Sequence, residues 1–463
     1  MKKFLLYFNL LALMCLVLEA QGQKENFIWC FGNHAGIDFR TNPPSFLNGT
    51  INNSLDNTSS ISDSAGNLLF YTDGVNVYSA NGSIMPGGVP LMGSSNGGQC
   101  ALIVPRPGSN LYYVFTVDQY HNNKGCRYSI VDMSLNSGSG AIISSNNLLF
   151  TPSTEKLEAV YNCNGNYFWI ITHPWGSNEF YVYKLDASGL IAMPVVSQVG
   201  SVHANAFNNA MGQMTLSPDK QRLACAIYDD GLIELFDFDI NTGVLSNAIT
   251  LTGFVHPWGI AFSSNSQMLY YTTWYTTDIH QLNVSLVNST SILNSKVNIG
   301  TVSGPGTQGY YAGYMQLAPD DKIYIASFDD NFLGVINNPN AQGNAALLVD
   351  NGFYLPGAVC NVGICRSVSN YCEETAVSEF AYQNSVSLYS LTEPTSLVLK
   401  NNSHTTLSKL TLKIYNALGQ EVYDEKIEQL NSSYLVNCHL QGGIYFVSLE
   451  NQKAYFRFKI LLN

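Results

Sequence analysis

The segment 213–247 constrains the fold more than any other, because the chain repeats its pattern of apolar runs and turns. Four apolar runs follow one another in this segment. The polar turn 217–221 separates the first two, the break 229–231 separates the second from the third, and the turn 240–243 precedes the last. Proline, glycine and short polar side chains favour chain reversal at such points. Four runs in about 35 residues predict one four-stranded antiparallel sheet.

The strand–turn–strand core of this segment occurs five more times. The copies are SDSAGNLLFYTDG (62–74), VPRPGSNLYYVFTVD (104–118), VYNCNGNYFWIITH (160–173), FSSNSQMLYYTTW (262–274) and LAPDDKIYIASFDD (317–330). Second strands are predicted to begin near Leu68, Leu111, Tyr167, Arg222, Met268 and Lys322, at steps of 43 to 56 residues. One such sheet cannot bury both of its faces, whereas several arranged in a ring can. The interval therefore predicts an all-β fold of the β-propeller type.

A partial copy lies near the N-terminus. Third strands of the full copies end in an apolar residue and an aspartate, at Asp132, Asp186 and Asp239. Asp38 stands in the same relation to an apolar strand and a following turn, but the first two strands are missing before it. We expect residues 27–48 to complete a last blade whose inner strands come from about 352–370, which would close the ring. Seven blades are predicted, with six as the alternative.

The first 22 residues have the pattern of a secretory signal peptide. Two lysines precede an apolar run over residues 4–18, and the small residues Ala20 and Gly22 follow it. No later segment has the roughly 18 uncharged apolar residues that a membrane-spanning helix requires. We therefore expect an exported chain without a membrane span after cleavage.

The charge of the chain excludes one class of partner. Lysine and arginine total 21 against 33 acidic residues, a net charge of −12. Such a surface repels a phosphate backbone, so no nucleic-acid partner is expected.

The ten cysteines leave the disulfide pattern open. Removal of Cys15 with the signal peptide leaves an odd number, so at least one thiol is unpaired or bridges two chains. Cys360, Cys365 and Cys372 lie where the ring should close, and Cys30 lies on the strand expected to close it. A bridge from Cys30 to one of these three is a hypothesis. A zinc site is disfavoured because the spacing is not C-x-x-C and no histidine is near in the sequence.

The repeat pattern stops after Cys372. Residues 373–387 form a polar connector, and residues 388–463 contain short alternating strands that predict a small β-sandwich. The expected organisation is a signal peptide (1–22), a propeller (23–372), a linker (373–387) and this C-terminal sandwich (388–463).

The C-terminal sandwich resembles a known family. KIYNALGQEVYDEKI and LVNCHLQGGIYFVSLENQKAYFRFKILL, within residues 413–463, are similar to the type A sorting domain of proteins exported by the type IX secretion system of Bacteroidota. The Tyr-Pro-Asn-Pro entry of that family is replaced here by LYSLTEPTSL. The resemblance implies the type IX machinery as a partner and a secreted or outer cell-surface location.

The preceding body has a resemblance of its own. IWCFGNHAGIDF, ISDSAGNLLFYTDGVNVY and KLEAVYNCNGNYFWIITH are similar to large WD-repeat-like propellers of the same bacteria, which often carry such a tail. Cys30 stands where that group usually has an aromatic residue. The resemblance covers most of residues 27–345 and implies a fold and a location rather than an activity.

No metal or cofactor is predicted. The segment 237–243 alternates acidic and amide side chains as a calcium loop does, but Thr242 and Ala248 occupy the positions where an EF-hand has glycine and glutamate. A turn is the better interpretation.

No established catalytic motif is present either. The chain has no G-x-S-x-G, H-E-x-x-H or P-loop sequence. The pairs Asp229–Asp230 and Asp329–Asp330 could support acid–base chemistry, although adjacent aspartates after a strand more often form turns. We predict a non-catalytic binding or adhesion module for an extracellular carbohydrate or protein. The alternatives are a hydrolase or lyase acting on a carbohydrate or lactone, and a purely structural surface component.

Strand direction predicts the binding face. In an up-and-down blade, the loops from second to third strands and the links to the next blade emerge on one face. HPWG occurs twice, at 173–176 after a second strand and at 256–259 before a first strand, so both copies should reach that face. Aromatic rings with a few acids around a channel mouth suit a sugar or a peptide. The alternative is that the tryptophans pack between blades. The predicted site residues are His173, Trp175, Tyr228, Asp229, His256, Trp258, Trp274, Tyr275, Tyr310 and Asp329, with Tyr120, His121 and Tyr311 beside them.

Overall fold

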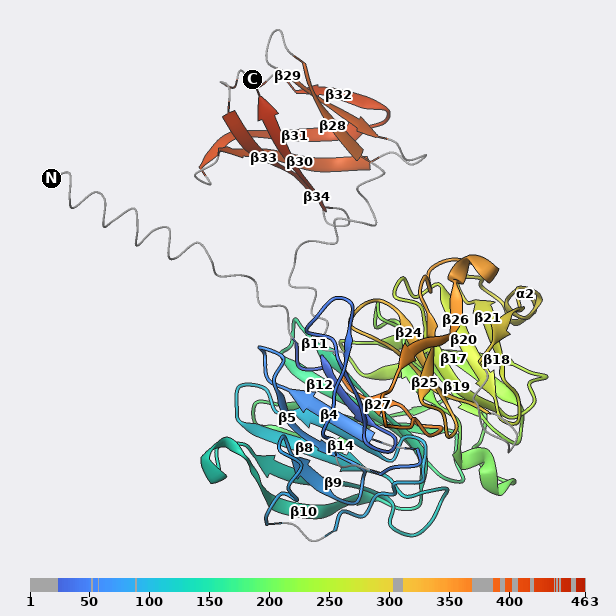
Figure 1. Ribbon diagram of the computed structural model, residues 1–463. Coiled ribbons are helices and arrows are strands. Elements are labelled where there is room, and N and C mark those ends of the chain that lie inside the picture. The colour runs from blue at the N-terminus through green and yellow to red at the C-terminus, as the bar shows by residue number, and fades with distance from the viewer. Residues whose placement is uncertain are drawn as a thin grey trace, which may run out of the picture. The chain divides into compact units, whose positions relative to one another are not determined.

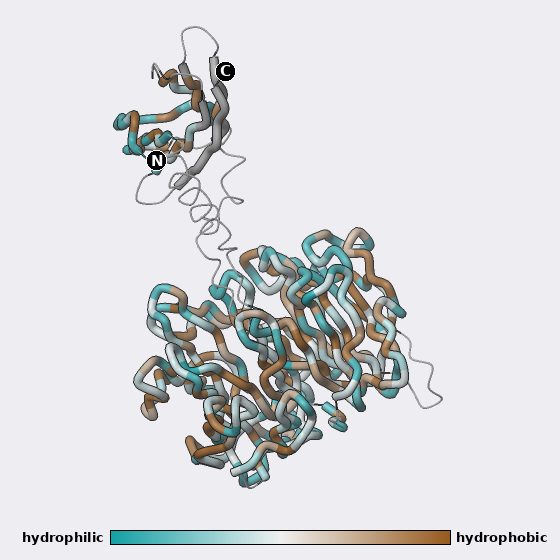
Figure 2. Tube along the Cα trace, turned by 60° about the vertical axis from the view of Figure 1, so that its left-hand side comes forward, coloured by the Kyte–Doolittle hydropathy of each residue, from teal (hydrophilic) through white to brown (hydrophobic). Residues whose placement is uncertain are grey.

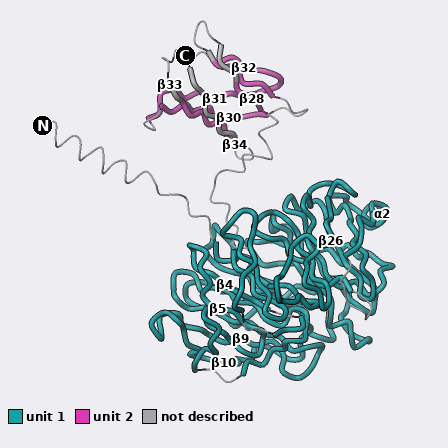
Figure 3. Tube along the Cα trace, in the orientation of Figure 1, with its two compact units in different colours: residues 1–371 teal, residues 372–463 magenta. Residues whose placement is uncertain are grey.

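The chain divides into two compact units, Met1–Tyr371 and Cys372–Asn463 (Figure 3). The computed structural model describes residues 24–50, 53–56, 58–87, 90–302, 311–368, 386–391, 396–401, 407–416, 420–436, 438, 440, 443–450 and 455–462. The signal peptide predicted for 1–22 and most of the linker predicted for 373–387 lie outside these residues. The last two residues of that linker belong to a strand that begins at Val386.

The described residues of the first unit form seven sheets, which confirms the predicted propeller with seven blades (Figure 1). Five sheets consist of four consecutive antiparallel strands. The first contains β7 (Ala101–Pro105), β8 (Leu111–Thr116), β9 (Cys126–Asp132) and β10 (Ala141–Phe150). The second contains β11 (Ser153–Asn162), β12 (Tyr167–Pro174), β13 (Glu179–Asp186) and β14 (Gly189–Gln198). The third contains β15 (Met214–Leu216), β16 (Arg222–Ile227), β17 (Leu232–Asp239) and β18 (Val244–Leu251). The fourth contains β19 (Pro257–Phe262), β20 (Met268–Thr273), β21 (Asp278–Asn283) and β22 (Val297–Thr301). The fifth contains β23 (Ala312–Leu317), β24 (Ile323–Ser327), β25 (Phe332–Ile336) and β26 (Leu348–Tyr354).

The two remaining sheets close the ring with a different strand pairing from the predicted one. Residues 27–48 make a three-stranded sheet of their own, formed by β1 (Ile28–Phe31), β2 (Ala35–Asp38) and β3 (Ser45–Phe46). The sheet of β4 (Thr58–Ser62), β5 (Leu68–Thr72) and β6 (Val77–Ser79) instead receives β27 (Cys365–Arg366), which pairs with β4 in parallel.

The chain after β26 explains this outcome. It forms an isolated bridge with the first sheet between Asn33 and Val359, shares an apolar core with that sheet through Leu355, and then pairs with β4 through β27. In Figure 1 the orange β27 accordingly lies beside the blue β4. The two ends of the ring therefore meet at the first sheet, as predicted, through one bridge and a shared core, but the strand pairing that closes the ring is made with β4.

The second strands begin where the repeat places them. β5, β8, β12, β16 and β20 start at the predicted residues, and β24 starts one residue late, at Ile323. The aspartate that ends the third strand has a turn-forming role. Asp132 Oδ1 accepts hydrogen bonds from the amide and hydroxyl of Ser134, at 2.8 and 2.6 Å. Asp186 makes the same pair of contacts with Ser188.

Apolar side chains between neighbouring sheets form the core of the unit. In Figure 2 brown, apolar positions follow the strands, and teal, polar positions mark many of the turns. Short helices lie in the connections: α2 (Ser289–Asn294), and the 3-10 helices η1 (Asn136–Gly138), η2 (Phe207–Ala210) and η3 (Gly343–Ala346). Among the described residues, no helix is long and apolar enough to cross a membrane.

The thiols beside the ring closure do not form the proposed bridge. Cys30 is a free, buried thiol, as are Cys360 and Cys365, and Cys372 lies outside the described residues. Cys365 instead lies 3.0 Å from the Ser60 hydroxyl. Cys163, which no bridge hypothesis included, is disulfide-bonded.

The second unit is a small β-sandwich. One sheet contains β28 (Val386–Leu391), β29 (Ser396–Asn401) and β32 (Ser433–Val436), and the other contains β30 (Leu407–Asn416), β31 (Glu421–Leu430), β33 (Gly443–Glu450) and β34 (Tyr455–Leu462). Leu397 and Leu399 of the first sheet share one apolar cluster with Leu412 and Ile414 of the second. This packing of two sheet faces confirms the predicted sandwich.

Candidate ligand-binding face

Aromatic side chains gather in the loops that follow second strands and precede first strands. One group, the Tyr275 cluster, consists of Tyr228, His256, Trp258, Trp274, Tyr275 and Tyr311. Trp274 stacks on Tyr311 with centroids 4.9 Å apart and lies 4.7 Å from Trp258. Tyr275 is 63% exposed at the outer side of this cluster. The contacts join three blades into one aromatic surface.

A second group, the Phe207 cluster, consists of Tyr120, His121, Trp175 and Phe207. The His121 ring lies 4.1 Å from that of Trp175 and 4.7 Å from that of Phe207. Tyr120 contacts Phe207 at 4.6 Å. Phe207 is 50% exposed, so this cluster also presents an open aromatic ring.

Asp229 connects the two clusters. Its carboxylate accepts hydrogen bonds from the backbone and side-chain nitrogens of Asn208, at 3.3 and 3.4 Å, and Asn208 follows Phe207 in η2. The same carboxylate lies 3.8 Å from Nδ1 of His256, whose ring stacks on Tyr228 at 4.5 Å. Both clusters therefore belong to one face, which we call the aromatic face.

The structure buries three of the predicted contact residues. His173, Tyr228 and Trp258 are 0%, 5% and 4% exposed, so they cannot offer a surface to a ligand and instead pack beneath the face. His173 stacks on His203 at 3.8 Å, and burial lowers its pKa to about 3.

The two HPWG copies consequently differ. His173 lies inside strand β12, which leaves Trp175 partly exposed beyond its end. In the second copy Trp258 lies inside β19, which leaves His256 partly exposed before its start. The first copy begins inside the end of a strand, and the second copy ends inside the start of a strand. The histidine is therefore buried in the first copy and the tryptophan in the second.

The other predicted residues have varied positions. Trp175, Asp229, His256 and Trp274 are partly exposed, while Tyr275 and Asp329 are exposed. Asp329 follows β24 and has a φ of 55°. Tyr310 lies outside the described residues.

A set of buried charges beneath the face was not predicted from the sequence. Glu155 and Lys156 lie on β11, the innermost strand of its sheet, and are 1% and 0% exposed. Lys156 Nζ donates to the carbonyl oxygens of Met211, Gly212 and Ala226. Charges in a β-strand suggest a solvent-facing side, but both faces of this strand are covered, by the segment of Gly98 and Tyr120 next to Glu155 and by the segment of Met211 and Ala226 next to Lys156. Their position in the first strand of a repeat was the available signal.

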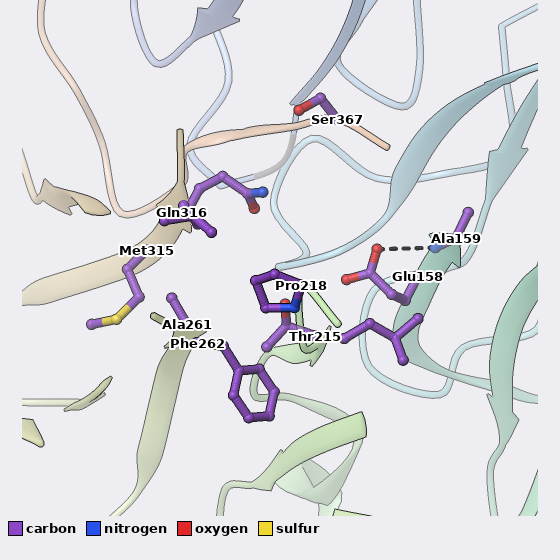
Figure 4. Close-up of a pocket in the computed structure, with 11 residues that line it drawn as sticks. Glu158, Ala159, Thr215, Pro218, Ala261, Phe262, Met315, Gln316 and Ser367 are labelled. Carbon is purple, nitrogen blue, oxygen red and sulfur yellow. Dashed lines mark hydrogen bonds between the residues drawn. The ribbon is translucent and has the colours of Figure 1, made fainter. Parts of the chain in front are cut away.

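A small cavity of about 40 Å³ lies among the first strands β11, β15, β19 and β23 of four neighbouring blades (Figure 4). Glu158 lines it, and this carboxylate accepts a 2.8 Å hydrogen bond from Arg366. A space of this size holds water-sized guests. It is too small for a sugar ring, which leaves the aromatic face as the better candidate.

The residues that the structure describes contain no group of three or more histidine, cysteine, aspartate or glutamate side chains arranged to hold a metal ion.

Comparison with known proteins identifies the C-terminal region. Residues 394–463 match the family described as a secretion system C-terminal sorting domain, which supports export of the chain to the cell surface or beyond. No curated protein sequence matches the chain.

Several solved structures are similar to the chain at low identity. The periplasmic gluconolactonase PpgL of Pseudomonas aeruginosa is 15% identical, with a TM-score of 0.37, over 78% of this chain and 94% of that one. A protein of unknown function from Desulfotomaculum acetoxidans is 14% identical, with a TM-score of 0.39, over 75% and 88%. A putative 6-phosphogluconolactonase from Bacteroides uniformis is 12% identical, with a TM-score of 0.39, over 80% and 95%.

Proposed function

We propose that this protein is a binding or adhesion propeller that recognises an extracellular carbohydrate through its aromatic face. In this proposal the signal peptide (1–22) is removed, and the type IX secretion machinery exports the propeller (23–372) by means of the sorting domain (388–463), which the linker (373–387) connects. A place among the WD-repeat-like propellers of Bacteroidota belongs to the same proposal.

The exposed rings of Tyr275 and Phe207 on one face carry this proposal. Each offers a flat apolar surface to the C–H face of a sugar, and Asp229, His256 and Asp329 can hydrogen-bond its hydroxyl groups. The buried residues below keep the rings in place, so little side-chain entropy is lost on binding.

The carboxylate pairs favour binding over hydrolysis. Asp229 accepts hydrogen bonds from Asn208, and the buried Asp330 accepts one from the backbone of Phe332 at 3.1 Å. One carboxylate of each pair is thus already hydrogen-bonded within the protein, Asp229 to the η2 segment and Asp330 to its own turn. Neither pair offers two unbound carboxylates for acid–base chemistry.

Calorimetric titration of the mature chain with cellohexaose, xylohexaose and laminarihexaose tests the proposal. At least one oligosaccharide should bind, and Tyr275→Ala and Phe207→Ala should each weaken binding about tenfold, because each removes a stacking ring. Tyr354→Ala is the matched control, since Tyr354 is 50% exposed but lies on the outer strand β26. Binding by none of the three sugars, or equal affinity in both face variants and the parent, would reject a carbohydrate site here.

A further inference from the structure

We propose that Glu155 is a positioning residue for the aromatic face, whose ionised carboxylate holds together the two loops that support it. This inference rests on the proposed function for its biological meaning, and on the structure alone for the contacts.

The carboxylate of Glu155 makes two strong contacts with backbone. Oε1 accepts a hydrogen bond from the amide of Tyr120, and Oε2 accepts one from the amide of Gly98, both at 2.7 Å. Hydrogen bonds to an ionised acceptor are short and roughly twice as strong as neutral ones. Since Glu155 is 1% exposed, water does not compete for either contact.

The first contact fixes the segment that carries two rings of the Phe207 cluster. Tyr120 has a φ of 56°, a left-handed conformation that side-chain-bearing residues adopt only at an energetic cost. The Glu155 carboxylate opposes relaxation of this backbone. Tyr120 and the adjacent His121 both contact Phe207, so release of the Tyr120 amide would free the cluster.

The second contact reaches towards the Tyr275 cluster. Gly98 lies so close to Tyr314 that a Cβ at this position would be 1.7 Å from the tyrosine hydroxyl oxygen. The Tyr314 ring packs 4.8 Å from Trp258, beneath the Tyr275 cluster. One carboxylate therefore holds a loop on each side of the face.

The charges around Glu155 decide when it is ionised. Burial raises the pKa of Glu155 to about 7, the amides of Tyr120 and Gly98 and the ammonium of Lys156 oppose that shift, and Asp118 adds to it. Burial, with Glu155 nearby, also raises the pKa of Asp56 well above its usual range. The other titratable and charged groups around this site are Cys100, Tyr120, Lys124 and Tyr314.

A fall in pH has opposite effects on the two loops and on global stability: protonation of Glu155 weakens its hydrogen bonds to the loops but favours the folded state. The carboxylate that accepts both amides predominates above a pH of about 7 and is replaced by the neutral acid below it. The raised pKa means that the folded state binds the proton more tightly than the unfolded state. Its contribution to folding is therefore complete below the unfolded pKa and is lost as pH rises through the folded value. If loop amides lose protection against hydrogen exchange at low pH, the cause is therefore local opening and not a loss of global stability through Glu155.

Hydrogen–deuterium exchange of the mature chain, corrected for intrinsic exchange rates, tests the inference. The ionised fraction of Glu155 falls about tenfold between about pH 8 and about pH 6, so amide protection in 117–125 should fall by about the same factor. A peptide from β16 serves as the internal reference and should show no change.

Two variants separate charge from packing. Glu155→Gln should give low protection of 117–125 at both pH values. Glu158→Gln is the matched control, because Glu158 lies on the same strand but bonds Arg366, and it should keep the profile of the parent. A flat profile in the parent, or a parent-like profile in Glu155→Gln, would overturn the inference. If Glu155→Gln does not fold, the parent series still decides.

Oligosaccharide titration at the same two pH values keeps the two proposals apart. Absence of sugar binding together with the expected exchange profile rejects the proposed function and leaves the positioning role intact. Binding that does not weaken at the lower pH, despite opened loops, rejects the link between Glu155 and the face.

Discussion

Substitution of Trp29 by alanine tests whether the three-stranded N-terminal sheet is a structural member of the ring. Trp29 lies in β1 and is 0% exposed. Its indole ring contacts Phe39 of its own region at 4.8 Å and Tyr324 of the last blade at 5.9 Å. It also shares a core cluster with Leu355, from the chain that returns to close the ring. Trp29 therefore joins both ends of the first unit.

The magnitude follows from the burial. Truncation of a fully buried tryptophan to alanine costs about 3–5 kcal/mol. The indole N–H of Trp29 has no hydrogen-bond partner among the residues that the structure describes, so its removal offsets a small part of this loss and favours a value of about 3 kcal/mol. The unfolding entropy of about 2.1 cal/mol/K per residue then corresponds, for a unit of about 340 residues, to a fall in Tm of about 4 °C.

Urea unfolding followed by tryptophan fluorescence measures this change. All five tryptophans lie in the first unit, so the signal reports on that unit alone. Trp175→Ala is the matched control, because Trp175 is partly exposed on the face and should cost only about 1 kcal/mol. If Trp29→Ala costs no more than Trp175→Ala, the first sheet does not stabilise the ring and the reasoning fails.

Two further predictions concern export and the thiols. Deletion of 388–463 should leave the propeller folded but retained inside the cell envelope, because each unit has its own core and the sorting domain is lost; immunoblots that find normal amounts in the medium would contradict this. Cys30 should resist alkylation in the native protein and react fully after denaturation without a reductant, since it is buried and free. A peptide map that places Cys30 in a disulfide would refute that assignment.

Local pattern was sufficient to predict the strands. Alternating apolar residues and turn-forming aspartates placed the starts of β5, β8, β12, β16 and β20 correctly. These signals depend on residues that are close in sequence, such as Asp132 and the Ser134 that it bonds in a turn. They can therefore be recognised from sequence. The seven-blade count followed from the six copies of the repeat together with the partial copy at 27–48.

The pairing of β27 with β4 could not be predicted in this way. It joins Cys365–Arg366 to Thr58–Ser62 in parallel, and a two-residue strand has no hydrophobic period to recognise. The partial blade at 27–48 offered a more obvious partner. Long-range geometry, rather than local propensity, decides between them.

The candidate site was predicted only in part, because local signals assign its loops to a face but long-range packing decides which side chains are exposed. Strand direction sends the loops to one face, so Trp175, His256, Trp274 and Tyr275 could be assigned to it before their contacts were known. Which ring of each HPWG copy is buried depends on where the strand begins, a boundary that sequence patterns place poorly. Glu155 was missed because its backbone partners, Gly98 and Tyr120, lie beside the strands of the neighbouring blade, far from it in sequence.

The parallel contact between β27 and β4 also determines when the propeller can finish folding. Thr58 and Cys365 lie about 300 positions apart, so closing this loop costs about 3 kcal/mol more chain entropy than closing a ten-residue hairpin. Blades can form one after another as the chain emerges, but β4 has no inner partner until the last residues of the unit arrive. The exported chain therefore passes through an open ring with an unpaired strand edge, which is the state most exposed to mispairing and proteolysis.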